Sequence, residues 1–303
     1  MSARVKNLEY YLQGIKEGNR IILGQAFTLI ESKNATQRAM AEEILSKLEF
    51  SKNASIRIGI SGSPGVGKST FIENLGKHIL KDNVKIAVLA VDPTSVISKG
   101  SILGDKTRMA ELSIHPNVFI RPSPNAETLG GVTSTTYESI LLCEAAGYDI
   151  IFVETVGVGQ AEVMVHNLVD CFVLLLLPGA GDDLQGIKRG IAELADLIVV
   201  HKADGDRLKL AKEIQRAYSN AIHFFAPKEH NIITQVVQAS SLDQTGVDEI
   251  WEIISEFNEQ IHSTDFKSQR RKQQKLSIFQ DLLNQKILAT FKSQNKDLIE
   301  SMY

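Results

Sequence analysis

The stretch from residue 62 to residue 70 reads Gly-Ser-Pro-Gly-Val-Gly-Lys-Ser-Thr and matches the pattern G-x-x-x-x-G-K-[ST]. A β-branched run over 56–61 precedes it and predicts a buried strand, and apolar residues at helical spacing over 71–80 follow it. Glycines in such a loop turn backbone N–H groups inward, and the next helix adds the positive end of its dipole. The pattern therefore predicts a P-loop that binds nucleotide phosphates, rather than a glycine-rich turn without a ligand.

Two side chains of this stretch carry specific chemistry. Lys68 is expected to reach the β- and γ-phosphates, and the Ser69 hydroxyl is expected to ligate Mg²⁺. The predicted nucleotide-binding residues of the stretch are Gly62, Ser63, Pro64, Gly65, Val66, Gly67, Lys68, Ser69 and Thr70.

The bulk properties of the chain exclude several classes of protein. Its 303 residues, 43% hydrophobic and 23% charged, suit a soluble protein with one substantial core and extensions. A net charge of −3 supplies no overall basic field for nucleic acid. Cys143 and Cys171 lie far apart outside any C-x-x-C pair, which argues against a disulfide framework or a cysteine zinc site and fits a reducing compartment.

The sequence also lacks the usual signals for a membrane. Residues 1–7 show no apolar core of a signal peptide, and the longest apolar run, 171–177, is too short to span a bilayer. We therefore expect a cytoplasmic protein without membrane insertion.

Beyond residue 55, apolar β-rich runs alternate with helical patterns. Several runs are apolar throughout, as over 150–153 and 172–177, which is typical of strands buried on both faces. We predict an α/β fold of the P-loop NTPase type, with a mostly parallel sheet flanked by helices. The predicted strands span 56–61, 85–92, 118–121, 149–155, 171–177, 197–201 and 233–239.

Helical extensions are predicted on both sides of a nucleotide domain over 55–262. Residues 1–54 show three amphipathic stripes, the third after an N-cap at Asn34 or Thr36. Residues 263–303 form a basic amphipathic helical arm, which could bind a membrane or a partner; packing on its own domain or on a second subunit is the favoured interpretation. The apolar stripe of this arm comprises Leu276, Phe279, Leu283, Ile287 and Phe291.

Acidic residues follow predicted strands at the edge where parallel sheets bind ligands. Asp92 would hold Mg²⁺ through water or orient the attacking water, although an N-cap or Asx turn is the alternative. Asp105 lies in a polar loop and could face a phosphate or the metal. Glu154 at a strand tip would hold Mg²⁺ through water, while a glycine N–H such as that of Gly157 meets the γ-phosphate.

Two loops are candidate switches. Loss of the γ-phosphate on hydrolysis would release the loop after Glu154, in which Gln160 suits either a water-positioning group or an ordinary loop amide. The next loop carries Asp182, Gln185 and Lys188 among four glycines. Its composition fits a switch and a surface loop equally well.

Residues 201–204 read His-Lys-Ala-Asp, which has the form of the guanine-reading motif N-K-x-D with histidine in the asparagine position. The Asp204 carboxylate can accept hydrogen bonds from N1–H and the exocyclic amine of guanine, a donor pair that adenine lacks. The aliphatic stem of Lys202 can cover the base, and His201 could donate to N7. The last base-contacting loop is expected at Ser240, Ser241 and Leu242.

Taken together, these motifs resemble the MeaB/ArgK family of cobalamin-mutase-associated GTPases, to which the methylmalonic aciduria type A protein belongs. The resembling segments are 62–70, 91–95, 100–109, 142–149, 154–160 and 181–188. The sequence differs from the family in His201 and in a short C-terminal arm.

The resemblance implies a GTPase with low intrinsic hydrolysis that binds GTP, GDP and Mg²⁺. It implies a chaperone that gates cofactor loading and protects an adenosylcobalamin-dependent acyl-CoA mutase, such as methylmalonyl-CoA mutase. Lys68, Asp92, Asp105 and Glu154 would then be catalytic, and Ser69 would join the three acids as metal ligands. Asp92 and Asp105 would belong to a first switch, and Gly157 and Gln160 to a second. Asp182, Gln185 and Lys188 would belong to a third switch, which relays nucleotide state to the mutase. Family members are homodimers, and the arm would contribute to the interface.

Three other functions remain open from the sequence. One is a kinase of an amino-acid (lysine/arginine/ornithine) transport system, for which no separate acceptor-side base is visible. Another is a metallochaperone GTPase for nickel or zinc, which would require a Cys/His cluster that the sequence does not show. The last is a nucleotide-sensing scaffold that scarcely hydrolyses its ligand.

Overall fold

The structure, a computed structural model, describes residues 6–50, 55–82, 84–91, 109–121, 129–155, 161–179 and 189–295. Within these residues, a seven-stranded sheet has the order β3-β2-β4-β1-β5-β6-β7, and every neighbouring pair is parallel. The strands are β1 (Ile56–Gly62), β2 (Ile86–Val91), β3 (Val118–Arg121), β4 (Ile150–Thr155), β5 (Cys171–Leu176), β6 (Leu197–His201) and β7 (Gln235–Ala239). All seven predicted strands are confirmed, with small shifts at their ends.

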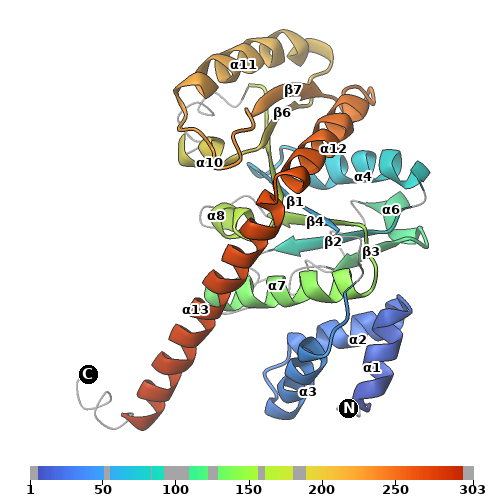
Figure 1. Cartoon of the computed structure of the whole chain (residues 1–303). Coiled ribbons are helices and arrows are strands. Elements are labelled where there is room, and N and C mark those ends of the chain that lie inside the picture. The colour runs from blue at the N-terminus through green and yellow to red at the C-terminus, as the bar shows by residue number, and fades with distance from the viewer. Residues whose placement is uncertain are drawn as a thin grey trace.

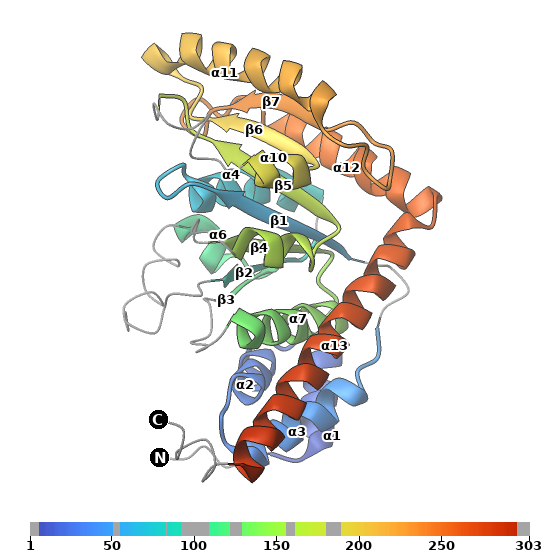
Figure 2. The same cartoon turned by 90° about the vertical axis from the view of Figure 1, so that its left-hand side faces the viewer.

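Helices cover both faces of this sheet (Figures 1 and 2). One face packs against α4 (Lys68–Ile79), α6 (Ala110–Ile114) and α12 (Val247–Ser263). The other face packs against α7 (Leu129–Ala145), α8 (Ala161–His166), α10 (Arg189–Leu194) and α11 (Leu208–Ala221). The predicted α/β class, with helices on both sides of the sheet, is therefore confirmed.

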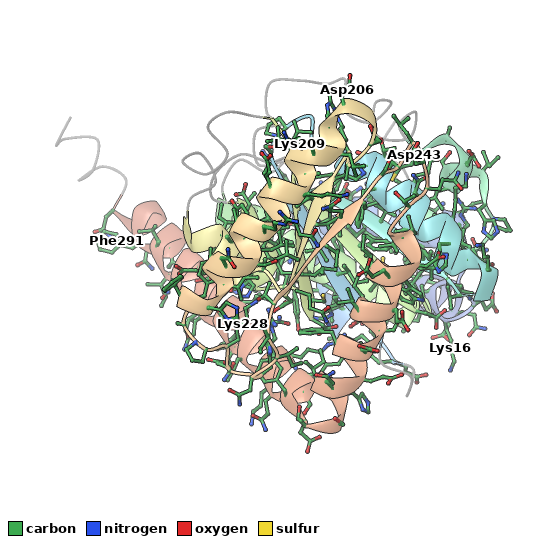
Figure 3. All side chains as sticks on the ribbon, turned by 90° about the horizontal axis from the view of Figure 1, so that it is seen from above. Lys16, Asp206, Lys209, Lys228, Asp243 and Phe291 are labelled. Carbon is green, nitrogen blue, oxygen red and sulfur yellow. The ribbon has the colours of Figure 1, made fainter. Side chains whose placement is uncertain are left out.

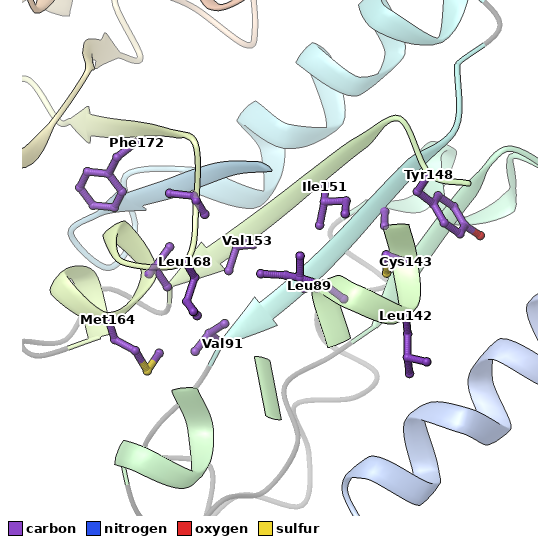
Figure 4. Packing of buried hydrophobic residues seen from close by; sticks show 14 of the residues in the cluster. Leu89, Val91, Leu142, Cys143, Tyr148, Ile151, Val153, Met164, Leu168 and Phe172 are labelled. Carbon is purple, nitrogen blue, oxygen red and sulfur yellow. The ribbon is translucent and has the colours of Figure 1, made fainter. Parts of the chain in front are cut away.

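Alternate strand residues supply the two layers of the core, because successive side chains of a strand point to opposite faces. Figure 4 shows one layer, which includes Leu89 and Val153 of the sheet and Leu142 and Met164 of the covering helices. Cys143 lies in this layer, whereas Cys171 lies in the other. Burial raises the pKa of both thiols.

Three N-terminal helices pack beside α7: α1 (Leu8–Lys16), α2 (Arg20–Ile30) and α3 (Ala35–Ser46). Each begins at an asparagine whose side chain accepts first-turn N–H groups, and Asn34 is the cap of the third. Arg38 of α3 binds Glu138 of α7, with 2.7 Å between Nη1 and Oε2.

The last described helix, α13 (Phe266–Gln294), is anchored by buried charges at the amino-terminal edge of the sheet. Arg271 makes two hydrogen bonds to Asp170 (2.8 and 2.6 Å), and Arg57 of β1 makes two to Glu144 (2.9 and 2.8 Å). Burial alone would raise the pKa of Asp170, but the hydrogen bond and charge of Arg271 outweigh it and lower that pKa. The arm is thus anchored through its polar face.

The predicted apolar stripe of α13 lies on the outside of this chain. Its five residues, from Leu276 to Phe291, are between 46% and 60% exposed, and Figure 3 shows Phe291 far from the body of the molecule. The helix does pack on its own domain, one of the two favoured interpretations, but it does so through its polar face and leaves this stripe exposed. Charge pairing rather than apolar periodicity decides which face of α13 docks.

No helix in the described ranges is long and apolar enough to cross a bilayer.

Beside the N-terminal half of α13, a cavity of about 470 Å³ is lined by His166, Asp196, Lys228 and Arg270. Arg270 Nη2 lies 3.1 Å from His166 Nε2, and His166 Nδ1 lies 3.2 Å from Asn167 Oδ1. Because arginine only donates, this network assigns the neutral ring with its proton on Nδ1.

The half-buried His166 predicts a loss of stability in mild acid. Burial, and then the charge of Arg270, lower the pKa of His166 to about 4. A histidine in an unfolded chain has a pKa near 6.5. Between that pH and pH 4, the side chain is therefore protonated in the unfolded chain but neutral in the folded chain. The free energy of unfolding consequently falls as the pH drops from 7 towards 4.

We expect His166→Gln to reduce this loss by about 2 kcal/mol between pH 7 and pH 5, since its amide oxygen can accept from Arg270 without titrating. Urea unfolding midpoints at both pH values test this. The comparison variant is His223→Gln, the same substitution at an exposed histidine. An identical pH dependence in wild type and His166→Gln would contradict the assignment.

Candidate functional site

The residues between β1 and α4 form the loop that the motif predicts. Gly62 has φ 150°, and a Cβ there would lie 2.5 Å from the carbonyl oxygen of Leu175. Gly67 has φ 97° and caps α4 in the left-handed region, where side chains are strained. The first N–H groups of α4 have no partner within the helix, so the loop and helix together suit an anion.

The two polar side chains at the start of α4 point into this loop and toward β4. Lys68 Nζ donates to the carbonyls of Gly62 (2.8 Å) and Ser63 (3.1 Å), which holds the ammonium inside the loop. Ser69 Oγ donates to Glu154 Oε1 at 2.9 Å. Glu154 reaches this position because it pairs in register with Ile60, two residues before the loop. The predicted Lys68, Ser69 and Glu154 are therefore brought together.

Several predicted residues lie outside the described part of the chain. They are Asp92, Asp105, Gly157, Gln160, Asp182, Gln185 and Lys188. The strands that precede these segments, β2, β4 and β5, end at the same sheet edge as β1.

The predicted base-reading residues lie at the carboxyl ends of β6 and β7. His201 ends β6 in register with Ala239 of β7, which brings Ser240 and Ser241 alongside. Ser240 Oγ donates to Asp204 Oδ2 at 2.6 Å, so the carboxylate is held in place. Figure 3 shows Asp206 and Asp243, which follow these strands, at one edge of the molecule, while Lys228, which precedes β7, lies away from it.

Contacts also join the β6 end to the phosphate loop. Lys202 has φ 58°, and its Nζ donates to the carbonyl of Gly65 at 2.8 Å. His201 Nδ1 lies 2.7 Å from the carbonyl oxygen of Val66, and Nε2 lies 2.7 Å from Ser241 Oγ. The predicted phosphate and base residues thus form one hydrogen-bonded unit.

One residue of this unit was not predicted. Asn74 of α4 donates from Nδ2 to the carbonyl of Ser241 at 2.9 Å. This bond fixes the predicted base-contacting loop, residues 240–242, to α4. An asparagine within a helical pattern carries no signal that identifies this contact in the sequence. Leu242, predicted to contact the base, is 83% exposed, so its neighbours in the chain do not cover its side chain.

Comparison with known proteins places the chain among GTPases. Residues 23–296 match the model of the family described as methylmalonyl Co-A mutase-associated GTPase MeaB. The chain is 44% identical over 291 residues to the mitochondrial methylmalonic aciduria type A homolog of Mus musculus, covering 92% of this chain and 70% of that protein. It is 41% identical over 277 residues to GTPase ArgK of Escherichia coli K12, covering 91% and 84%.

A solved structure extends the similarity to the fold. The protein described as LAO/AO transport system kinase matches with a TM-score of 0.81 and 33% identity, over 97% of this chain and 89% of that chain.

The position of Asp204 predicts its effect on nucleotide choice. Asp204→Asn should reduce the preference for GDP over ADP about 10- to 100-fold, because hydrogen bonds from guanine donors to a carboxylate are lost or weakened. Calorimetric titration with both nucleotides measures the ratio. Asp206→Asn, at an exposed position nearby, is the matched control. An unchanged ratio of GDP to ADP affinity in Asp204→Asn would show that Asp204 does not recognise the base.

Proposed function

Since the chain belongs to the family of methylmalonyl-CoA mutase-associated GTPases, MeaB, we propose that it is a GTP-hydrolysing chaperone of an adenosylcobalamin-dependent acyl-CoA mutase. It would gate cofactor loading and protect the mutase from inactivation. The observation that carries the proposal is one connected site, in which a P-loop, Glu154 and Asp204 lie at one sheet edge, within a family match of nearly the whole chain.

In this site the P-loop residues 62–70 bind the phosphates, and Lys68 neutralises the charge on the β- and γ-oxygens. Asp204 accepts the donors of guanine, and the stem of Lys202 lies along the base. Ser240 supports this reading by holding the Asp204 carboxylate. Binding through both halves orients the γ-phosphate for attack by water.

The proposed metal ion is Mg²⁺. A hydroxyl and a carboxylate oxygen lie 2.9 Å apart at Ser69 and Glu154, and such hard oxygen donors are those that Mg²⁺ prefers. These two residues, with Asp92 and Asp105, would hold the ion, which would neutralise phosphate charge when bound. Lys68 then acts beside the ion as a second positive group.

We further propose that three loops report the nucleotide state, the first of which carries Asp92 and Asp105. Gly157 and Gln160 follow β4, and Asp182, Gln185 and Lys188 follow β5, so the second and third loops leave strands that flank β1. Shifting a two-state loop almost completely requires about 5 kcal/mol of differential binding, which contacts to the γ-phosphate can supply in large part. The third loop would relay this change to the mutase.

A homodimer is the proposed assembly. The exposed stripe of α13 is a row of large apolar side chains on a helix whose polar face is already docked. A second copy of the chain would cover this row and remove it from water. We keep the division into an N-terminal extension over 1–54, a GTPase domain over 55–262 and an arm over 263–303, and a cytoplasmic location, as part of this proposal.

A kinase of an amino-acid transport system is the second candidate, because a similar solved protein is described as LAO/AO transport system kinase. It predicts phosphoryl transfer to a protein acceptor. For the metallochaperone alternative, the described residues contain no group of three or more His, Cys, Asp or Glu side chains placed to hold a metal ion.

The test is hydrolysis of GTP, with ATP in parallel, alone and with an adenosylcobalamin-dependent acyl-CoA mutase from the same cell. We expect a low GTP rate that rises strongly with the mutase, and almost no activity for Lys68→Ala. Lys188→Ala should keep the low rate and lose most of the stimulation. A GTP rate that no mutase changes would contradict the chaperone role, and faster ATP turnover with a phosphorylated protein product would favour the kinase.

A further inference from the structure

The side chain of His201 is fixed at both ends by the protein. Nδ1 lies 2.7 Å from the Val66 carbonyl oxygen, which can only accept, so Nδ1 carries the proton. Burial lowers the pKa of His201, and the ring is therefore neutral near pH 7. Nε2 then holds a lone pair and accepts from the Ser241 hydroxyl at 2.7 Å.

The ring is also enclosed by apolar and backbone contacts. It is 1% exposed, and Phe71 of α4 meets it edge-on with 5.7 Å between ring centroids. A Cβ at Gly67 would lie 2.9 Å from its Cε1, so the P-loop backbone packs directly on the ring. Lys202 and Asp204 are the charged neighbours that act on it. The ring therefore has one orientation.

This arrangement uses the whole hydrogen-bonding capacity of a neutral imidazole, which is one donor and one acceptor. An asparagine amide at the same place would have two N–H donors and an oxygen, and would keep a group free for the base. His201 keeps none. The possibility that it donates to N7 of guanine conflicts with both contacts.

We propose that His201 is a positioning residue that ties the P-loop to the base-reading loop and contacts no atom of the base. The proposal rests on the nucleotide site proposed above. Its neighbour Lys202 supports the same role, because it binds the adjacent P-loop carbonyl, that of Gly65, at 2.8 Å. His201, the last residue of β6, and Lys202, which follows it, therefore hold two consecutive loop carbonyls, and Asn74 of α4 binds the carbonyl of Ser241.

Two consequences follow for nucleotide binding. Loss of the His201 tie loosens the phosphate loop, so affinity falls for every nucleotide that uses it. Recognition of the base remains with Asp204, so the choice among purines stays nearly unchanged. A residue that bound N7 would also leave the choice among purines unchanged, because guanine, adenine and hypoxanthine all carry N7. The two roles are therefore separated by an analogue that lacks N7 and by variants that restore one end of the side chain.

The first experiment compares GDP with 7-deaza-GDP, which lacks N7, by calorimetric titration of the wild-type protein. We expect equal affinities, whereas a hydrogen bond from His201 to N7 would weaken the analogue about five- to tenfold and overturn the proposal. If neither nucleotide binds, the proposed GTP site fails as well, so the two failures are distinguishable.

The second experiment separates the two hydrogen bonds of His201, from Nδ1 to Val66 and from Ser241 to Nε2. The amide nitrogen of an asparagine lies as many bonds from Cα as Nδ1 does, whereas the amide of a glutamine reaches as far as Nε2. His201→Ala should weaken GDP binding about tenfold or more, through loss of two buried hydrogen bonds, and His201→Asn should recover most of the loss because it restores the bond to Val66. His201→Gln should recover less. Equal recovery by both variants, or no loss in His201→Ala, would contradict the proposal.

Selectivity is read in the same titrations with inosine diphosphate, which lacks the exocyclic amine. The ratio of GDP to inosine diphosphate affinity should stay within about twofold in His201→Ala, since the Asp204 contacts to the base remain. A collapse of this ratio would contradict the proposal, because it would show that His201 contributes to recognition of the exocyclic amine. Should His201→Ala fail to fold, Ser241→Ala removes the hydroxyl at the Nε2 end and should weaken GDP and inosine diphosphate by the same factor.

Discussion

The parallel pairing of every neighbouring strand in the described sheet is the constraint on which the site depends. Parallel strands end at one edge, so segments far apart in the sequence meet there. The pairing of β4 with β1 sets the position of Glu154, and the pairing of β7 with β6 sets the positions of Ser240 and Ser241. Strand order therefore sets the distances between the residues proposed to bind the phosphates, the metal ion and the base.

The central strand β1 also connects the two ends of the molecule. Gly62 at its carboxyl end opens the phosphate loop, and Arg57 near its amino end binds Glu144 in the charge cluster that anchors α13. These two residues are about 17 Å apart along an extended strand. The polar face of the long helix is thus fixed to the same strand that leads into the P-loop, while its apolar face is left outward.

The sequence predicted most of this architecture because the signals are local. Continuous apolar runs such as 172–177 identify buried strands, and the spacing of Gly67, Lys68 and Ser69 identifies the loop. The partners of His201 could not be predicted, because Val66 lies 135 residues away in the chain and only the strand order brings it near. The docking face of α13 was missed for a related reason: helical periodicity locates apolar residues, whereas Arg271 and its partner Asp170 form a pair that periodicity does not encode.

The positions of the two cysteines allow the halves of the core to be observed separately. Cys143 and Cys171 are buried in the layers on opposite faces of the sheet, and both thiols have raised pKa values. A thiol-alkylating reagent requires an exposed thiolate, so it modifies each cysteine only when its own layer opens. The alkylation rates of the two sites, resolved by mass spectrometry, would therefore report whether the helical layers of this protein open together or one before the other.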